Sequence, residues 1–328
     1  MYMAWSVYVT RIIAQPAIDL LEETCNVDIN RDDRVLKKAE LVERVKRKDG
    51  VLCLLTDRID EEVIDAADTA KVLANCAVGF DNIDVDAATR RGILVTNTPG
   101  VLTDTTAELA WALVFAAARR IAEADRFTRA GRFSGWSPTL FLGQDITDKT
   151  LGVVGAGRIG TAFAEKSRGF RMRILYNDLR RNPGFEKATG GTYVPLETLL
   201  EEADIVSLHV PLTPETVHLI GGEELARMKK TAVLVNTSRG PVVDERALAE
   251  ALKEGKIAGA GLDVYEEEPK ISRELLALDN VVLAPHIGSA SVETRTKMAL
   301  MAAEDLLAAL RGETPANLVN PEALARRR

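Results

Sequence analysis

The sequence predicts an α/β protein built from two parallel β-sheets with helices on both faces of each. Three observations lead to this prediction. Short apolar runs alternate with helical patterns along nearly the whole chain, as is typical of parallel sheets. The chain has 328 residues, which is enough for about two domains. A glycine fingerprint, Gly155 to Gly160 (GAGRIG), stands between two of the apolar runs near the middle of the chain.

The first hundred residues predict a small domain of their own. We expect strands at 7–13, 51–55, 72–74 and 93–95, and helices at 35–46, 61–67 and 84–91. The helix-breaking residues 97–100 precede a long apolar helix at 103–120, which we interpret as the crossover to a second domain.

The glycine fingerprint opens the second domain. We expect strands at 151–154, 172–176, 205–210, 232–236, 259–264 and 281–284, with helices at 161–168 and 291–310. If the last helix packs on the first domain, that domain is discontinuous. The domains are then 1–101 with 288–328, of flavodoxin-like type and binding the substrate, and the inserted 102–287, which binds a dinucleotide.

The fingerprint lies in a complete strand–turn–helix–strand unit that ends at Asp178, as a Rossmann-type dinucleotide site requires. Gly155 permits the tight turn, Gly157 lets the backbone approach a pyrophosphate, and Gly160 lets the helix pack closely on the strand. The N–H groups at the start of the helix are available to phosphates. We therefore expect a nicotinamide dinucleotide here, with Asp178 on its ribose.

Composition excludes several other classes of function. The net charge of −7 argues against nucleic acid as a partner. The longest apolar stretch, 109–118, is too short to span a bilayer and reads as a buried helix. Residues 1–10 lack the features of a signal peptide, and the cysteines Cys25, Cys53 and Cys76 lack paired spacing, so we expect a reduced, cytoplasmic protein without a metal site.

Polar residues follow the strands of the second domain, where a parallel sheet binds its ligands. They include His209, Arg239 and His286. Of the three histidines, we expect His218 to be solvated and His209 to line the cofactor. His286 follows an apolar strand and lies downstream of an acidic cluster, so a carboxylate there could stabilise its protonated form. His286 could equally be a capping residue, and Arg239 could pair with Asp244 or bind a keto acid as a fork.

Several segments together resemble the D-isomer-specific 2-hydroxyacid dehydrogenase family, and among its members most closely the glyoxylate/hydroxypyruvate reductases. The resemblance runs from Leu52 to about Asn320. It rests on segments 77–84 (AVGFDNID), 101–108 (VLTDTTAE), 155–160, 236–240 (NTSRG), 261–265 (GLDVY) and 285–288 (PHIG).

The resemblance implies catalytic roles for three residues. Arg239 would bind the carboxylate and keto oxygen of a 2-keto acid, Glu268 would orient and charge His286, and His286 would protonate the carbonyl oxygen as hydride arrives. The N–H groups of Val78 and Gly79 would hold the carboxylate, and domain closure would exclude water. The residues expected at the cofactor are Thr106, Gly155, Gly157, Arg158, Ile159, Gly160, Asp178, His209, Val210, Pro211, Thr216, Thr237, Ser238, Asp263 and Gly288.

Further residues narrow the choice of cofactor and the choice of substrate. Asp178 favours NADH, whereas Arg180 and Arg181 keep NADPH open. A small pocket lined by Leu54 and Leu55, with Trp136 from the partner of a homodimer, would suit glyoxylate or hydroxypyruvate. The alternatives are 3-phosphoglycerate or another D-2-hydroxy acid, and a nucleotide-sensing protein that resembles the corepressors of this fold.

Overall fold

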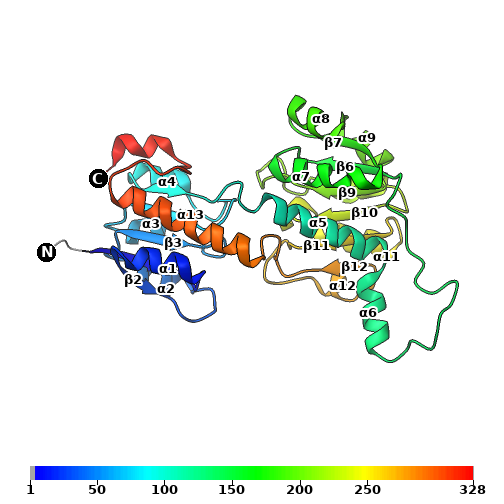
Figure 1. The fold of residues 1–328 in the computed structure, drawn as a ribbon, viewed down its shortest axis with the longest axis horizontal. Coiled ribbons are helices and arrows are strands. Elements are labelled where there is room, and N and C mark those ends of the chain that lie inside the picture. The colour runs from blue at the N-terminus through cyan, green and yellow to red at the C-terminus, as the bar shows by residue number, and fades with distance from the viewer. Residues whose placement is uncertain (1–3, 328) are drawn as a thin grey trace. The chain divides into compact units, whose positions relative to one another are not determined.

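The computed structural model describes residues 4–327 and divides into two compact units. One consists of the chain up to Leu102 together with the chain from Ala290, and the other runs from Thr103 to Ser289. Each unit contains one parallel β-sheet with helices packed against it (Figure 1). This confirms the predicted α/β class.

The first unit has a five-stranded sheet in the order β2-β1-β3-β4-β5, the flavodoxin-like order. Its strands are β1 (Trp5–Val9), β2 (Cys25–Ile29), β3 (Gly50–Cys53), β4 (Val72–Asn75) and β5 (Leu94–Thr96). Its helices are α1 (Gln15–Glu22), α2 (Lys38–Val45), α3 (Glu61–Ala66), α4 (Val85–Arg90), α13 (Val292–Leu310) and the 3-10 turn Pro321–Arg326. Helix α13 packs against α1, β3 and β4, so the end of the chain completes this unit.

The second unit has a seven-stranded sheet in the order β12-β11-β10-β9-β6-β7-β8. Its strands are β6 (Thr150–Val154), β7 (Arg173–Asn177), β8 (Thr192–Tyr193), β9 (Ile205–Leu208), β10 (Val233–Asn236), β11 (Gly259–Leu262) and β12 (Val281–Leu283). Its helices are α5 (Thr103–Ala118), α6 (Ile121–Arg129), α7 (Arg158–Lys166), α8 (Pro183–Thr189), α9 (Leu196–Glu202), α10 (Gly222–Arg227), α11 (Glu245–Lys253) and α12 (Arg273–Leu276), with 3-10 turns at Ser167–Phe170 and Gly240–Val242.

In this second sheet the strand order reverses at β6. From β6, strands β7 and β8 follow in order toward one edge of the sheet, and β9 to β12 follow in order toward the other edge. All the strands are parallel. This is the Rossmann arrangement, in which a ligand binds outside the carboxyl ends of the strands at the point of reversal. The turn after β6 is the glycine fingerprint, so the topology places it at that point.

Apolar residues explain why these segments form buried strands. Val51, Leu52 and Cys53 are all fully buried, as a parallel sheet covered on both faces requires. In the second unit the ring of Trp111 stacks on Phe163 with centroids 4.8 Å apart, which fixes α5 against α7.

Several predicted boundaries are wrong. Helix α7 begins at Arg158 rather than at residue 161, because the fingerprint itself supplies the first turn. The strand predicted at 205–210 ends at Leu208, and the strand predicted at 7–13 covers Trp5–Val9. The helix predicted at 35–46 begins at Lys38. The strand predicted at 72–74 extends to Asn75 as β4.

Among the elements that escaped prediction, β2, α6 and β8 bury few or no side chains. Strand β2 (sequence CNVDI) lies at the edge of its sheet and buries only Cys25. Helix α6 has no buried residue, and β8 is two residues long. The three cysteines are free and buried, and burial raises the pKa of each thiol. Within residues 4–327, no helix combines the length and the apolar character needed to cross a membrane.

Candidate active site

The glycine turn after β6 has the geometry that the fingerprint predicts. Gly155 has a positive φ of +96°, and a side chain on it would strike the backbone of His209 at 2.7 Å. A side chain on Gly160 would lie 2.0 Å from the carbonyl oxygen of Gly155. Gly157 faces open space, because no atom lies within 4 Å of the place that a side-chain carbon would take. The turn is therefore closed on its protein side and open where a pyrophosphate would bind.

The carboxylate of Asp178 is fixed beside this turn. It accepts hydrogen bonds from the N–H of Ala156 at 2.7 Å and from the N–H of Leu179 at 2.7 Å. Asn182 donates from its amide to the carbonyl oxygen of Ala156 at 2.8 Å, which ties the following loop to the turn. Carboxylate oxygens have further acceptor capacity, so Asp178 can also accept from ribose hydroxyls.

The two arginines after Asp178 differ in their surroundings. The guanidinium of Arg181 binds both carboxylate oxygens of Glu186, at 2.7 and 2.9 Å, and Arg180 is exposed. The Glu186 carboxylate also accepts from the hydroxyl of Tyr176. Arg181 is thus already paired with the first turn of α8.

The three histidines have different surroundings in the structure. Burial lowers the pKa of His209 to about 3, so its ring is neutral at physiological pH. Its Nε2 lies 2.9 Å from the Ser207 hydroxyl, and its Nδ1 is buried without a hydrogen-bond partner in the described part of the chain. A buried imidazole that stays neutral is not suited to the role of an imidazolium proton donor.

His218, which was expected to be solvated, is exposed and also pairs with a carboxylate. Its Nε2 lies 2.7 Å from a carboxylate oxygen of Glu266, and its side chain is 42% exposed. It lies in the connection between β9 and α10, outside the segments that resemble the family.

His286 lies directly beyond β12, at the carboxyl edge of the sheet. Its Nδ1 is 2.8 Å from a carboxylate oxygen of Glu268, whose other oxygen accepts from the N–H of Tyr265 at 3.0 Å. Burial alone would raise the pKa of Glu268, but the hydrogen bond and charge of His286 hold that pKa below its usual value. Because Nδ1 is engaged, Nε2 is the ring atom left to exchange a proton with a ligand.

Asp263, which follows β11, holds the loop that carries His286. Its two carboxylate oxygens accept from the N–H groups of Ile287 and Gly288, both at 2.7 Å, and its carbonyl oxygen accepts from the N–H of His286 at 2.9 Å. Asp263 is 1% exposed, and burial raises its pKa despite these bonds. The backbone of His286 has a positive φ of +55°, so this loop is held in a conformation that non-glycine residues seldom adopt.

Arg239 lies in a loop shaped by Asn236 at the end of β10. The amide of Asn236 donates to the Arg239 carbonyl at 2.9 Å, and its oxygen accepts from the N–H of Ser238 at 3.0 Å. A side chain on Gly240 would overlap the carbonyl of Tyr265, so the loop packs directly on the segment that leads to Glu268. The charge of Arg239 accordingly contributes to lowering the Glu268 pKa. Arg239, Glu268 and His286 therefore form one cluster, and the alternative partner Asp244 instead caps α11 through the N–H of Ala247.

The remaining residues expected at the cofactor lie in the second unit near the same edge. Thr106 and Thr237 are buried, and the Thr237 hydroxyl has no hydrogen-bond partner within residues 4–327. A side chain on Gly288 would lie 3.4 Å from Thr106. Thr216 closes a local turn by donating to the Pro211 carbonyl at 2.7 Å. Their contacts with a cofactor remain predictions.

The first unit carries the other residues expected at the substrate. Leu54 follows β3, and its turn is fastened by Asp57, which accepts from the Leu54 N–H at 2.8 Å. Val78 and Gly79 follow β4 and are half-buried. Both groups stand at the carboxyl edge of the first sheet.

Trp136 lies on the segment 130–149, which extends away from the second sheet between α6 and β6 (Figure 1). Trp136 is 85% exposed, so it is not part of an enclosed pocket within residues 4–327.

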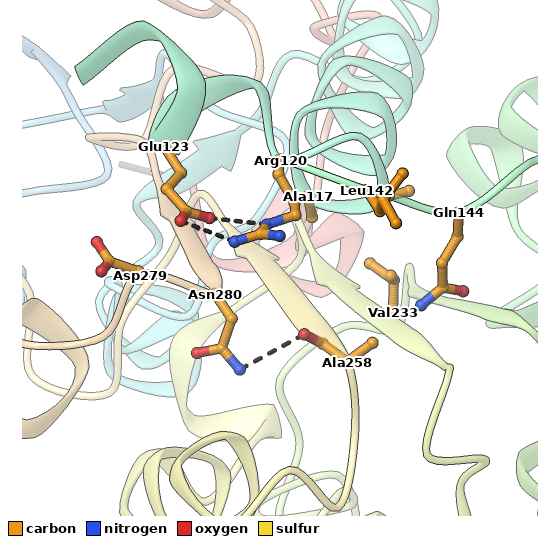
Figure 2. A pocket seen from close by; sticks show the side chains of 11 residues that line it. Ala117, Arg120, Glu123, Leu142, Gln144, Val233, Ala258, Asp279 and Asn280 are labelled. Atoms are coloured by element: carbon orange, nitrogen blue, oxygen red, sulfur yellow. Dashed lines mark hydrogen bonds and ion pairs between the residues drawn. The ribbon is translucent and has the colours of Figure 1, made fainter. Parts of the chain in front are cut away.

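A cavity of about 370 Å³ lies at the other end of the second sheet (Figure 2). It is lined by Val233 at the start of β10, by Ala258 and Asn280 just before β11 and β12, and by the end of α5. Arg120 there is paired with Glu123 at 2.8 Å. None of the residues expected in the active site lines this cavity, which separates it from the edge where the catalytic cluster lies.

These features define a Rossmann-type dinucleotide-binding unit with a histidine–carboxylate pair and an arginine at its ligand edge. Residues 111–288 match the model of the D-isomer specific 2-hydroxyacid dehydrogenase NAD binding domain. The chain belongs to the D-isomer specific 2-hydroxyacid dehydrogenase family, which confirms the resemblance, and it uses NAD or NADP as its cofactor.

Similar proteins include a glyoxylate reductase of Korarchaeum cryptofilum, 58% identical over 96% of each chain. A solved structure of a Thermus thermophilus protein has a TM-score of 0.91 and 47% identity over 96% of this chain and 99% of that chain. An NADPH-dependent glyoxylate/hydroxypyruvate reductase from Sinorhizobium meliloti, solved with NADP and malonate, has a TM-score of 0.85 and 33% identity over 97% of each chain.

Proposed function

We propose that this protein reduces glyoxylate to glycolate and hydroxypyruvate to D-glycerate, with a reduced nicotinamide dinucleotide as the hydride donor. The observation that carries the proposal is the 2.8 Å pair of His286 and Glu268 beside Arg239, at the sheet edge where the glycine turn also lies. The name and the 58% identity of the Korarchaeum cryptofilum reductase support the choice of substrate.

The residues at the glycine turn fit a dinucleotide. The open face of Gly157 leaves room for a pyrophosphate at the start of α7, and Asp178 is fixed where the ribose of the adenosine half binds in this fold. When bound, the nicotinamide supplies hydride to the carbonyl carbon of the substrate.

The residues of the chain supply the remaining chemistry. Arg239 would bind the keto oxygen and carboxylate and draw electron density from the carbonyl carbon. His286 would donate the proton on Nε2 to the carbonyl oxygen, and Glu268 would stabilise the imidazolium through Nδ1. The N–H groups of Val78 and Gly79 would bind the carboxylate of the substrate.

The activity can be tested by following the loss of NADH and NADPH absorbance with glyoxylate, hydroxypyruvate and pyruvate in parallel. We expect the two proposed substrates to be reduced with higher kcat/KM than pyruvate. If the protein binds NADH but reduces none of the three keto acids, the proposal is wrong. That result would favour the alternative of a nucleotide-sensing protein.

Asp178→Ser should shift cofactor use toward NADPH. The carboxylate accepts from ribose hydroxyls and repels a 2′-phosphate, so its loss should raise the NADPH to NADH ratio of kcat/KM by about tenfold or more. Dissociation constants for the two dinucleotides, measured by fluorescence without substrate, should change in the same direction. Asp279→Ser, which removes an exposed aspartate paired with Arg126, is the control and should leave the ratio unchanged. An unchanged ratio in Asp178→Ser would show that Asp178 does not contact the ribose.

We also propose that the protein works as a homodimer in the cytoplasm. The segment 130–149 exposes Phe133 (57%), Trp136 (85%) and Leu142 (66%), apolar side chains that a second copy of the chain could cover. Three buried free thiols suit a reducing compartment. Sedimentation velocity should give a dimer, and Trp136→Ala should raise the dimer dissociation constant about tenfold or more. Ile12→Ala, at an exposed apolar residue of the other unit, is the control. A monomeric wild-type protein would contradict the proposal.

A further inference from the structure

The loop after β4 presents three successive backbone N–H groups that no group in the described part of the chain accepts. They belong to Val78, Gly79 and Phe80. Val78 and Gly79 are half-buried, and Phe80 is 40% exposed. Three successive N–H groups without an acceptor in the described part of the chain are open to an acceptor from outside it, and such a series of backbone donors suits an anion.

The carbonyl groups of the same loop are all occupied. The carbonyl of Ala77 accepts from the N–H of Thr98 at 2.8 Å, that of Val78 from the amide of Asn97 at 2.7 Å, and that of Gly79 from the amide of Asn75 at 2.8 Å. These peptides are trans, so each C=O points opposite to the N–H of the next residue. Holding the three carbonyls therefore fixes the directions of the N–H groups of Val78, Gly79 and Phe80.

Asn75 also connects this loop to the turn that carries Leu54. Asn75 is fully buried at the end of β4, and its amide lies 3.3 Å from the side-chain oxygen of Asn82. Asn82 in turn donates to the carbonyl oxygens of Leu54 and Asp57, each at 3.1 Å. One buried amide thus aligns both loops at the carboxyl edge of the first sheet.

We propose that Asn75 and Asn97 are positioning residues that hold the 77–80 loop as a preorganised backbone receptor for the carboxylate of the 2-keto acid. The inference rests on the proposed function, and it adds the N–H of Phe80 to the groups that face the substrate. Donors fixed before the ligand arrives bind an anion without the cost of ordering a flexible loop.

The test uses Asn75→Ser, which removes the amide without changing the charge of the site. We expect KM for glyoxylate to rise about tenfold or more, with kcat changed less than about threefold, because binding energy common to the ground state and the transition state is lost. The dissociation constant of oxamate, an unreactive analogue, measured by fluorescence on the protein saturated with NADH, should rise by the same factor. NADH binding should not change.

Asn320→Ser is the matched control. Asn320 is a 1% exposed asparagine of the same unit whose amide donates to the carbonyl of Ile93 at 3.0 Å, away from the 77–80 loop. It should lower Tm while leaving KM and oxamate binding unchanged. If KM for glyoxylate and the oxamate dissociation constant of Asn75→Ser lie within about twofold of those of Asn320→Ser, the inference is wrong.

Three further outcomes are decisive. If Asn75→Ser does not fold, the half-buried Asn97→Ser is judged by the same criteria, since it frees the Val78 carbonyl. If the wild-type protein binds oxamate but reduces no keto acid, the proposed function is wrong. The change in the oxamate dissociation constant of the variants then tests the backbone receptor by itself. A wild-type protein saturated with NADH that binds no oxamate would contradict the receptor itself.

Discussion

His286→Gln should lower kcat for glyoxylate reduction by about a thousandfold or more while leaving NADH binding nearly unchanged. Glutamine fills similar space and can still bond to Glu268, but it cannot donate a proton to the carbonyl oxygen. General acid catalysis by a positioned histidine is worth about 10²–10⁴ in rate, and this variant also loses the positive charge beside the substrate.

The measurement is single-turnover decay of NADH absorbance together with the NADH dissociation constant. His218→Gln is a matched control, because His218 also pairs with a glutamate, Glu266, at 2.7 Å. It should keep kcat within about twofold of wild type. Comparable turnover in His286→Gln, or equal losses in both variants, would refute the assignment of His286 as the proton donor.

Arg239→Lys should lower kcat/KM for glyoxylate by about 10²–10³. Lysine keeps the positive charge but cannot bind two oxygens as a fork, so both the orientation of the keto acid and the polarisation of its carbonyl are lost. NADH affinity should stay within about threefold of wild type, since Arg239 is assigned to the substrate.

The control for this variant is Arg227→Lys, which makes the same substitution in an exposed arginine paired with Glu201 at 3.2 Å. Exposed pairs of this kind contribute little to stability, so we expect wild-type kinetics. Steady-state kinetics and an NADH titration on both variants give the comparison. Undiminished kcat/KM in Arg239→Lys would contradict the role of Arg239 as a substrate anchor.

Much of the fold could be predicted because buried parallel strands consist of continuous apolar residues. The strands that were predicted, such as β6 and β10, are buried over nearly their whole length. The missed elements obey different constraints. Strand β2 lies at an edge with only Cys25 buried, and α6 buries nothing, so neither contains the continuous apolar run that marks the buried strands.

The catalytic cluster could be anticipated in part from the sequence. Parallel strands deliver the residues that follow them to one edge, and this suffices to single out Arg239 and His286. Glu268 was assigned to His286 only through the resemblance, because no spacing separates it from the neighbouring Glu266 and Glu267. The structure pairs His286 with Glu268 at 2.8 Å.

Asn75 and Asn97 were missed for a similar reason. Asn97 falls in the helix-breaking residues 97–100, and Asn75 follows the strand predicted at 72–74. Their positions where strands give way to turns were a usable signal, since asparagine side chains in turns often bond to nearby backbone groups. Which carbonyls they bind is decided by tertiary structure.

The most direct test of the account is the stereochemistry of the product. The purified protein is incubated with hydroxypyruvate and NADH, and the glycerate formed is resolved by chiral chromatography. If Arg239 and His286 hold the keto acid as in the family's site, hydride reaches one face of the carbonyl carbon and the product is D-glycerate alone. L-glycerate, a racemic mixture, or no glycerate from protein that binds NADH would contradict it.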